Sequence, residues 1–187
     1  MQKKKRIILA ITGATGTLYA LEFLKLMKEL NVEVHGLVSD AARKVMELEL
    51  GSDIDLSEYT DHWHDVHDFT APMASGSAAF DAMVVLPCSM GSLAAIANGI
   101  SANLIHRAAD VTLKERRPLI LAVRETPFNR THLKNMLKAN DAGAIICPPM
   151  PAFYHKIDDF NDLARIFAGR LAGLLGVQVP DQPRWGS

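Results

Sequence analysis

Short apolar runs alternate with amphipathic stretches along almost the whole chain. The apolar runs are rich in Ile, Val and Leu, the composition of strands covered on both faces in a parallel sheet. The predicted strands are Arg6–Ile11, Glu33–Val38, Ala82–Pro87, Pro118–Val123 and Ala144–Cys147. The predicted helices are Leu18–Leu30, Ala41–Leu50, Gly91–Ala97, Arg107–Glu115, Thr131–Ala139 and Asp159–Leu175. The alternation predicts one domain over residues 1–187, a three-layer α/β/α fold with a Rossmann-like, doubly wound parallel sheet.

The last predicted helix has the clearest helical period. Its apolar side chains recur at three- and four-residue steps and form one stripe. Asp158 or Asp159 can cap the start of the helix, and Gly176 can end it. The stripe consists of Phe160, Leu163, Phe167, Leu171 and Leu174.

Composition and charge limit the class of protein. The chain has 187 residues, of which 49% are hydrophobic and 22% charged, so it is globular rather than disordered. A formal net charge of -1 argues against a general nucleic-acid binder. Cys88 and Cys147 each follow or end an apolar run, so no disulfide framework is expected. The apolar run after the basic start is too short for a signal peptide, and no membrane-length run follows, so we expect a cytoplasmic protein.

Small, hydroxylated or charged residues follow nearly every predicted strand. In open parallel sheets, ligands bind beyond the carboxyl ends of the strands. This coincidence therefore predicts a ligand site at that edge of the sheet. The segments at the strand exits are Thr12–Gly16, Ser39–Asp40, Cys88–Ser92, Arg124–Glu125 and Pro148–Pro149.

Two of these segments, residues 12–16 and 88–92, lead from a strand into a helix. Glycine lets the backbone approach a ligand closely, and free amides at a helix start favour a phosphate. Two such loops at one edge suit a mononucleotide. The alternative for residues 12–16 is a tight turn that binds no ligand. The alternative for Ser39, Ser89 and Ser92 is ordinary helix capping, which does not exclude ligand contact. The first loop lacks the spacing of the dinucleotide fingerprint.

Charged and aromatic residues mark the later exits. An arginine such as Arg124 can bind a phosphate through two hydrogen bonds, and a carboxylate such as Glu125 can take part in proton transfer. By charge alone, residues 107–118 predict no more than a solvated helix end. Read without a family, Tyr154, after a proline-rich segment, is expected to be a packed aromatic rather than a site residue, and Arg170, on the last helix, a surface charge.

Three histidines lie close together in the first half of the chain. His62, His64 and His67 are spaced i, i+2, i+5, which matches no common zinc pattern, and no Cys/His cluster accompanies them. We expect a polar surface loop here and no metal site.

Taken together, these motifs resemble the flavin prenyltransferase family (UbiX/Pad type), formerly described as aromatic acid decarboxylases. The resemblance covers nearly the whole chain, from Thr12-Gly13-Ala14 to Arg184-Trp185-Gly186. Each motif alone could arise by chance, but their order and spacing together carry the resemblance. The most specific pieces are residues 74–77 (Ala-Ser-Gly-Ser), 107–111, 113–119, 124–127 (Arg-Glu-Thr-Pro) and 151–155.

The resemblance implies a role for each matching position. Implied FMN contacts are Gly13, Ala14, Thr15, Ser39, Ser89, Met90, Gly91, Ser92 and Arg124. Implied contacts with dimethylallyl monophosphate are Tyr154, Arg170 and Lys114, and Trp185 corresponds to a C-terminal aromatic that helps to close the site. Lys114 and Glu125 match positions that handle phosphate and protons across a subunit boundary, and Ser75 belongs to a loop that lines the active site.

Two positions depart from the family pattern. The first loop has Thr15 where the family often has Ser, which keeps the hydroxyl. The second loop has Met90 where the family often has Thr, so a flavin contact there has to use the backbone.

The reaction implied is transfer of a dimethylallyl group to N5 and C6 of reduced FMN without a metal, in a homo-oligomer that is commonly a dodecamer. Its product would serve a UbiD-type decarboxylase, often in ubiquinone biosynthesis. Two alternatives remain: a flavin-dependent cysteine decarboxylase, whose Asn- and Trp-containing substrate motif is absent from residues 149–154, and a flavin carrier without catalysis.

Overall fold

The computed structural model describes residues 4–51, 55–60, 62–152, 156–180 and 182. These residues form a six-stranded parallel sheet with strand order β3-β2-β1-β4-β5-β6. The strands are β1 (Arg6–Ile11), β2 (Glu33–Val38), β3 (His62–His64), β4 (Ala82–Cys88), β5 (Leu119–Val123) and β6 (Ile145–Ile146). The chain starts in the middle of the sheet, builds outward to β3, and returns to build the other half from β4. The order of strands therefore reverses between β1 and β4, where doubly wound sheets bind ligands.

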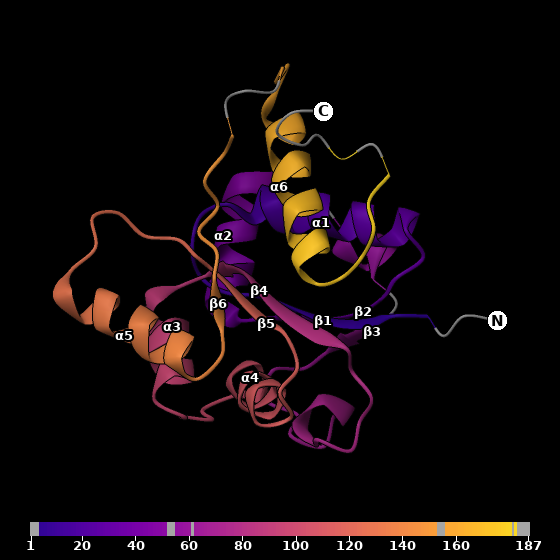
Figure 1. Cartoon of the computed structure of the whole chain (residues 1–187). Helices are drawn as coiled ribbons and strands as arrows, with labels where there is room; N and C mark the ends of the chain where they lie inside the picture. Colours follow the sequence, from indigo (N-terminus) through magenta and orange to yellow (C-terminus); the bar gives the residue numbers. More distant parts are fainter. Residues whose placement is uncertain (1–3, 52–54, 61, 153–155, 181, 183–187) are drawn as a thin grey trace.

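Helices cover both faces of the sheet, as predicted. In Figure 1, α1, α2 and α6 lie above the sheet and α3, α4 and α5 lie below it. The helices are α1 (Thr17–Glu29), α2 (Asp40–Leu50), α3 (Met90–Ala97), α4 (Leu104–Lys114), α5 (Arg130–Asp141) and α6 (Phe160–Leu174). Among the described residues, no helix is long and apolar enough to cross a membrane.

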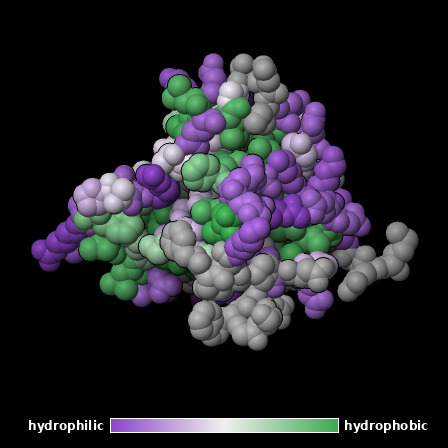
Figure 2. Space-filling model, turned by 90° about the horizontal axis from the view of Figure 1, so that it is seen from above, coloured by the Kyte–Doolittle hydropathy of each residue, from purple (hydrophilic) through white to green (hydrophobic). Residues whose placement is uncertain are grey.

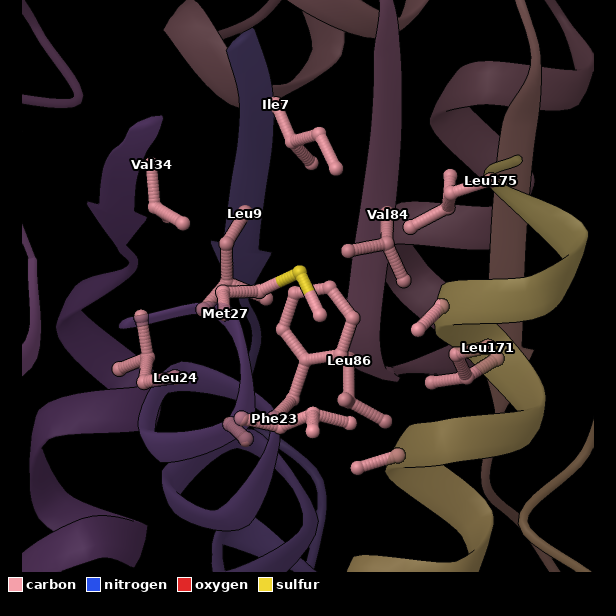
Figure 3. Close-up of a cluster of buried hydrophobic side chains, with 14 of the residues drawn as sticks. Ile7, Leu9, Phe23, Leu24, Met27, Val34, Val84, Leu86, Leu171 and Leu175 are labelled. Carbon is pink, nitrogen blue, oxygen red and sulfur yellow. The ribbon is translucent and has the colours of Figure 1, made fainter. Parts of the chain in front are cut away.

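Two apolar clusters fill the space between the layers, because successive strand residues point to opposite faces of the sheet. Above the sheet, Leu9 and Leu86 meet side chains from α1 and α6 such as Phe23 and Leu171 (Figure 3). The cluster below the sheet is formed by alternate strand residues and by α3 and α4. Nearly all of these strand residues are fully buried, as their unbroken apolar sequence predicts.

The structure corrects several boundaries. Helix α4 begins at Leu104, where Asn103 caps it, three residues earlier than the charge pattern indicated. Strand β6 is shorter than predicted, at Ile145–Ile146. Asp159 caps α6 as expected, but Phe160 is 79% exposed, and of the predicted stripe only Phe167 and Leu171 are buried.

The prediction of a surface loop at the histidines is wrong for His62 and His64, which belong to the edge strand β3. Trp63 between them packs onto Gly36 of β2, where a Cβ atom would lie 2.3 Å from the indole ring. The two histidines point to the opposite face and stack beside His35, whose Nδ1 lies 2.9 Å from Nε2 of His64. A strand of three residues with polar alternate positions carries too little apolar signal to be recognised in the sequence.

Candidate functional site

Hydrogen bonds between the loops hold the strand exits together at the point where the strand order reverses. The hydroxyl of Thr12 donates to the carbonyl of Pro87 over 2.8 Å and accepts from the amide of Ser89 over 2.8 Å. The amide of Arg124 donates to the carbonyl of Cys88 over 3.0 Å. The loops after β1, β4 and β5 therefore form one surface, which confirms the prediction that these segments meet.

Gly13 brings the first loop against the start of α2. A Cβ atom at this position would lie 2.5 Å from the Cβ of Ala41, closer than two carbon atoms can approach. The backbone of the loop therefore contacts α2 directly, and any larger residue would push the two segments apart.

A carboxylate of the protein already occupies the start of α1. Gly16, with φ 102°, precedes the helix and supplies no side-chain cap. Glu49 of α2 takes this role: its carboxylate accepts from the amides of Gly16 and Thr17 over 3.0 and 2.8 Å and from the Thr17 hydroxyl over 2.7 Å. The prediction of free amides for a phosphate is therefore wrong at this helix.

The Glu49 carboxylate is held in its charged form. Burial acts to raise its pKa, but hydrogen bonds from Thr15, Thr17 and the Gly16 amide outweigh this effect and lower the pKa below its ordinary value. Thr15 thus joins the carboxylate to the cavity that lies on the other side of the loop.

The start of α3 suits an anion better. Ser89 caps this helix by accepting from the amide of Ser92 over 3.3 Å, and no acidic side chain lies in the first turn. Within the described residues, no group accepts a hydrogen bond from the amide of Met90 or Gly91. Helix α2 is capped in the same way by Ser39, but its first residue is Asp40, whose charge disfavours an anion there.

A cavity of about 490 Å³ lies beside these loops, between α1 and the exits of β5 and β6. This volume is within the range of small-molecule sites. Among the described residues, the cavity is lined by one arginine, Arg124, whose positive charge acts to lower the pKa of the Tyr19 hydroxyl. Glu125 also lines the cavity and accepts from the amide of Thr126 over 2.9 Å. The lining residues are Thr15, Gly16, Tyr19, Val123, Arg124, Glu125, Thr126, Phe128, Pro148, Pro149 and Met150.

A second cavity, of about 290 Å³, adjoins the first. Pro148 and Met150 line both, so the segment after β6 separates them. The walls of the second cavity are mostly apolar side chains of α6 and this segment, with Arg170 as the cation. The Arg170 charge opposes the burial that raises the pKa of Cys147. Burial raises the pKa of the other thiol, Cys88, to about 12, so it is not a nucleophile at neutral pH.

Two of the predicted site residues lie at the opposite end of the sheet. Lys114 ends α4, and Ser75 precedes β4, so both lie where the parallel strands begin. Lys114 pairs with Glu115 beside Gly76, and Arg117 donates to the Gly76 carbonyl over 2.8 Å. The chain therefore does not bring Lys114 and Ser75 to the cavity that contains Arg124. Tyr154 and Trp185 lie outside the described residues.

The sequence reasoning missed two residues of this site. Glu49 reaches the first loop from 32 positions away, and in the sequence it is one of several glutamates on a surface helix. Tyr19 lies one turn into a predicted helix, where an aromatic residue indicates core packing rather than a site. Neither position carries a local signal.

The histidines at the sheet edge form a hydrogen-bonded cluster outside this site. Among the described residues, Glu33, His35 and His62 have their possible ligand atoms within 4.8 Å of one another. The guanidinium of Arg6 donates to Glu33 over 2.8 Å and lies 3.3 Å from Nε2 of His35, so a cation of the protein itself already neutralises the Glu33 carboxylate. The Glu33–His35 contact of 2.8 Å completes a network of the protein's own charges.

The strand order 3-2-1-4-5-6, the reversal point between β1 and β4, and the convergent small-residue loops define a mononucleotide-binding α/β protein. Comparison with known proteins is more specific. The model of the family described as "Flavoprotein" matches residues 1–171. The flavin prenyltransferase UbiX of Methanocaldococcus jannaschii is 48% identical over 97% of this chain and 99% of its own. The chain belongs to the flavin prenyltransferase family of flavoproteins.

Solved structures agree with this assignment. The crystal structure of AnUbiX (PadA1) in complex with FMN and dimethylallyl pyrophosphate has a TM-score of 0.94 and 42% sequence identity, with 99% of each chain covered. A dodecameric FMN-dependent UbiX-like decarboxylase from Escherichia coli O157:H7 has a TM-score of 0.91 and 37% identity over 97% of this chain and all of that one. Family membership decides against the cysteine decarboxylase alternative.

Proposed function

We propose that this chain, as one domain, transfers a dimethylallyl group from dimethylallyl monophosphate to N5 and C6 of reduced FMN. The observation that carries the proposal is the pair of adjoining cavities, each with one arginine in its wall: Arg124 in the first and Arg170 in the second. The reaction brings two phosphate groups together, one on the flavin and one on the prenyl donor. Such a site needs cations on more than one side and an apolar space between them.

The residues around the strand exits fit a flavin mononucleotide. The free amides of Met90 and Gly91 at the start of α3 would hold its phosphate, with the hydroxyls of Ser89 and Ser92 beside them. Met90 uses its backbone in this arrangement, so the loss of the family's hydroxyl at that position has no cost. Gly13 lets the first loop lie directly against Ala41 of α2. The further flavin contacts that we propose are Gly13, Ala14, Thr15, Ser39 and Arg124.

The residues of the cavity also fit the chemistry of prenyl transfer. Reduced flavin supplies the nucleophilic N5. As the bond between C1 and the phosphate oxygen breaks, negative charge grows on the phosphate, and preorganised cations such as Arg124 and Arg170 stabilise it. Such a donor is typically worth about 10²–10³ in rate. The apolar wall of α6 excludes water from the allylic group.

Ring closure requires that a proton leave flavin C6, and two carboxylates could accept it. Glu125 lines the first cavity, and Glu49 lies behind Thr15 at its edge. We propose Glu125 for this proton relay. The variants Glu125→Gln and Glu49→Gln distinguish the two carboxylates. Only the variant that lacks the proton acceptor should accumulate a flavin that is alkylated at N5 but not closed at C6.

Lys114 and Ser75 require a second copy of the chain to reach the site. Both lie at the amino end of the sheet, away from Arg124. The dodecameric relative supports assembly of this chain into a homododecamer. We propose that in this assembly the amino end of the sheet in one subunit completes the cavity of another. An exposed apolar surface supports self-association: Leu133 and Leu137 on the projecting helix α5 are 55% and 63% exposed, and apolar side chains gather over this end of the molecule in Figure 2.

Anaerobic incubation with reduced FMN and dimethylallyl monophosphate tests the proposal. The expected result is a flavin heavier by one prenyl unit, released together with one equivalent of phosphate. A flavin of unchanged mass that nevertheless binds the protein would favour the flavin-carrier alternative. We further propose a cytoplasmic location and a UbiD-type decarboxylase as the acceptor of the product.

A further inference from the structure

Tyr19 is a residue of the first cavity that the family resemblance did not assign. It lies in the first turns of α1, three residues after Gly16, and lines the same cavity as Arg124. Its ring contacts Phe167 of α6 edge to face, with ring centroids 5.3 Å apart and an interplanar angle of 74°. On another side, the ring packs against Gly16, where an added Cβ would lie 3.1 Å from Cδ2. These two contacts fix the direction of the side chain.

The hydroxyl of Tyr19 has the surroundings of an anion donor. Within the part of the chain that the structure describes, its oxygen takes part in no hydrogen bond. Burial raises the pKa of this phenol and the charge of Arg124 opposes the rise, so at neutral pH the hydroxyl keeps its proton and can donate it. A half-buried donor without a protein partner, beside an arginine and at a cavity wall, is placed to donate a hydrogen bond to an anion bound in the cavity.

We propose that the Tyr19 hydroxyl donates a hydrogen bond to the phosphate of the prenyl donor, next to Arg124, and strengthens it as the phosphate leaves. In this step the bond between C1 and the phosphate oxygen breaks and its electron pair goes to that oxygen. The new bond of C1 forms to flavin N5, the N5 proton passes to the released phosphate, and Tyr19 retains its own proton. Tyr19 is therefore a catalytic residue for leaving-group stabilisation. This inference rests on the proposed function.

The geometry gives Tyr19 a task that Arg124 alone does not perform. Arg124 follows β5, whereas Tyr19 belongs to α1, so a phosphate in the cavity is held by donors from two separate elements. Two donors fixed on separate elements orient the departing oxygen, which helps to align C1 with the nucleophile.

The variant Tyr19→Phe removes one oxygen atom and keeps the contacts with Phe167 and Gly16, so it should fold normally. We expect kcat/KM for dimethylallyl monophosphate to fall about 100- to 1000-fold, the range for a lost transition-state donor, while the Kd of FMN changes less than about twofold. The matched control is Tyr59→Phe, a half-buried tyrosine in the helical turn Leu56–Tyr59 that lines neither of the two cavities and whose ring packs under Lys28. This control should behave like the wild type.

Binding of inorganic phosphate to the FMN-loaded protein, measured by calorimetry without turnover, separates this role from a structural one. We expect the Kd of phosphate to rise about fivefold in Tyr19→Phe and to stay unchanged in Tyr59→Phe. Unchanged phosphate affinity together with unchanged kcat/KM would overturn the assignment, and so would a loss of FMN affinity that accounts for the whole defect. If the wild type binds FMN and phosphate but transfers no prenyl group, the proposed function fails, and the phosphate measurement still decides whether Tyr19 contacts the anion.

Discussion

The substitution Glu49→Gln tests whether a carboxylate stabilises the start of α1. The native side chain accepts from two backbone amides and one hydroxyl at 2.7 to 3.0 Å. Glutamine keeps one oxygen acceptor but loses the charge and replaces the second oxygen with a donor that faces other donors. Hydrogen bonds to charged groups contribute about 1.5–3 kcal/mol, and a charge at a helix start about 0.3–1 kcal/mol.

Solvent reduces these values, because Glu49 lies on the surface and is only partly buried. We therefore expect the free energy of unfolding to fall by about 1 kcal/mol, which for a chain of this size lowers the Tm by roughly 2–4 °C. Urea titration of the flavin-free protein measures the effect. The control Glu47→Gln changes a neighbouring exposed glutamate on the same helix and should leave stability unchanged.

The pH dependence provides an independent check. Because the pKa of Glu49 is lowered in the folded protein, its charged form contributes stability that is present above the unfolded pKa of about 4.3 and lost as the pH falls through the folded value. The difference between wild type and Glu49→Gln should thus shrink in acid. Equal stability of the two proteins from pH 7 downward would refute the capping role.

Three further outcomes follow from the geometry. Gly13→Val makes the new side chain clash with the Cβ of Ala41, so it should weaken FMN binding at least tenfold and lower the free energy of unfolding by about 1–3 kcal/mol. Flavin titration and urea unfolding measure the two effects, and wild-type FMN affinity would contradict this expectation. Burial lowers the pKa of His35, so the neutral form is favoured on folding and stability is lost as the pH falls below about 6.5. His35→Gln should flatten the stability profile between pH 5 and 7, and an unchanged slope would be the contrary result. Arg124→Ala should weaken FMN or prenyl-donor binding, whereas Arg130→Ala, on exposed α5, should not; equal affinities in titrations of both variants would exclude Arg124 from the site.

The sequence predicts the sheet and its ligand edge well, because buried parallel strands carry an unbroken apolar signal. Strands such as Arg6–Ile11 and Glu33–Val38 have the predicted bounds. The segments that follow them contact each other, as expected, where Gly13 lies against Ala41. Strand β3 was missed because an edge strand of three residues presents only one apolar side chain, the half-buried Trp63, and its other two residues are histidines, which a sequence pattern treats as polar.

The site could be predicted only where its residues follow strands. Arg124 and Ser89 occupy strand exits, so position in the fold identifies them. Glu49 and Tyr19 act through tertiary contacts across a loop or between two helices, and the sequence contains no pattern for such contacts. Lys114 presents the opposite case: the resemblance assigns it to the site, yet within one chain it lies at the other end of the sheet.

Subunit complementation tests most directly whether Arg124 and Lys114 of one active site come from different subunits. Lys114→Ala and Arg124→Ala should each abolish most prenyl transfer when assayed alone. If one subunit supplies Arg124 and its neighbour supplies Lys114, mixed oligomers formed by co-expression of the two variants should regain activity. With equal and random mixing, about a quarter of the sites contain both intact residues, so about a quarter of the wild-type activity is expected. Mixed oligomers that stay as inactive as either variant would contradict a site assembled from opposite ends of two chains.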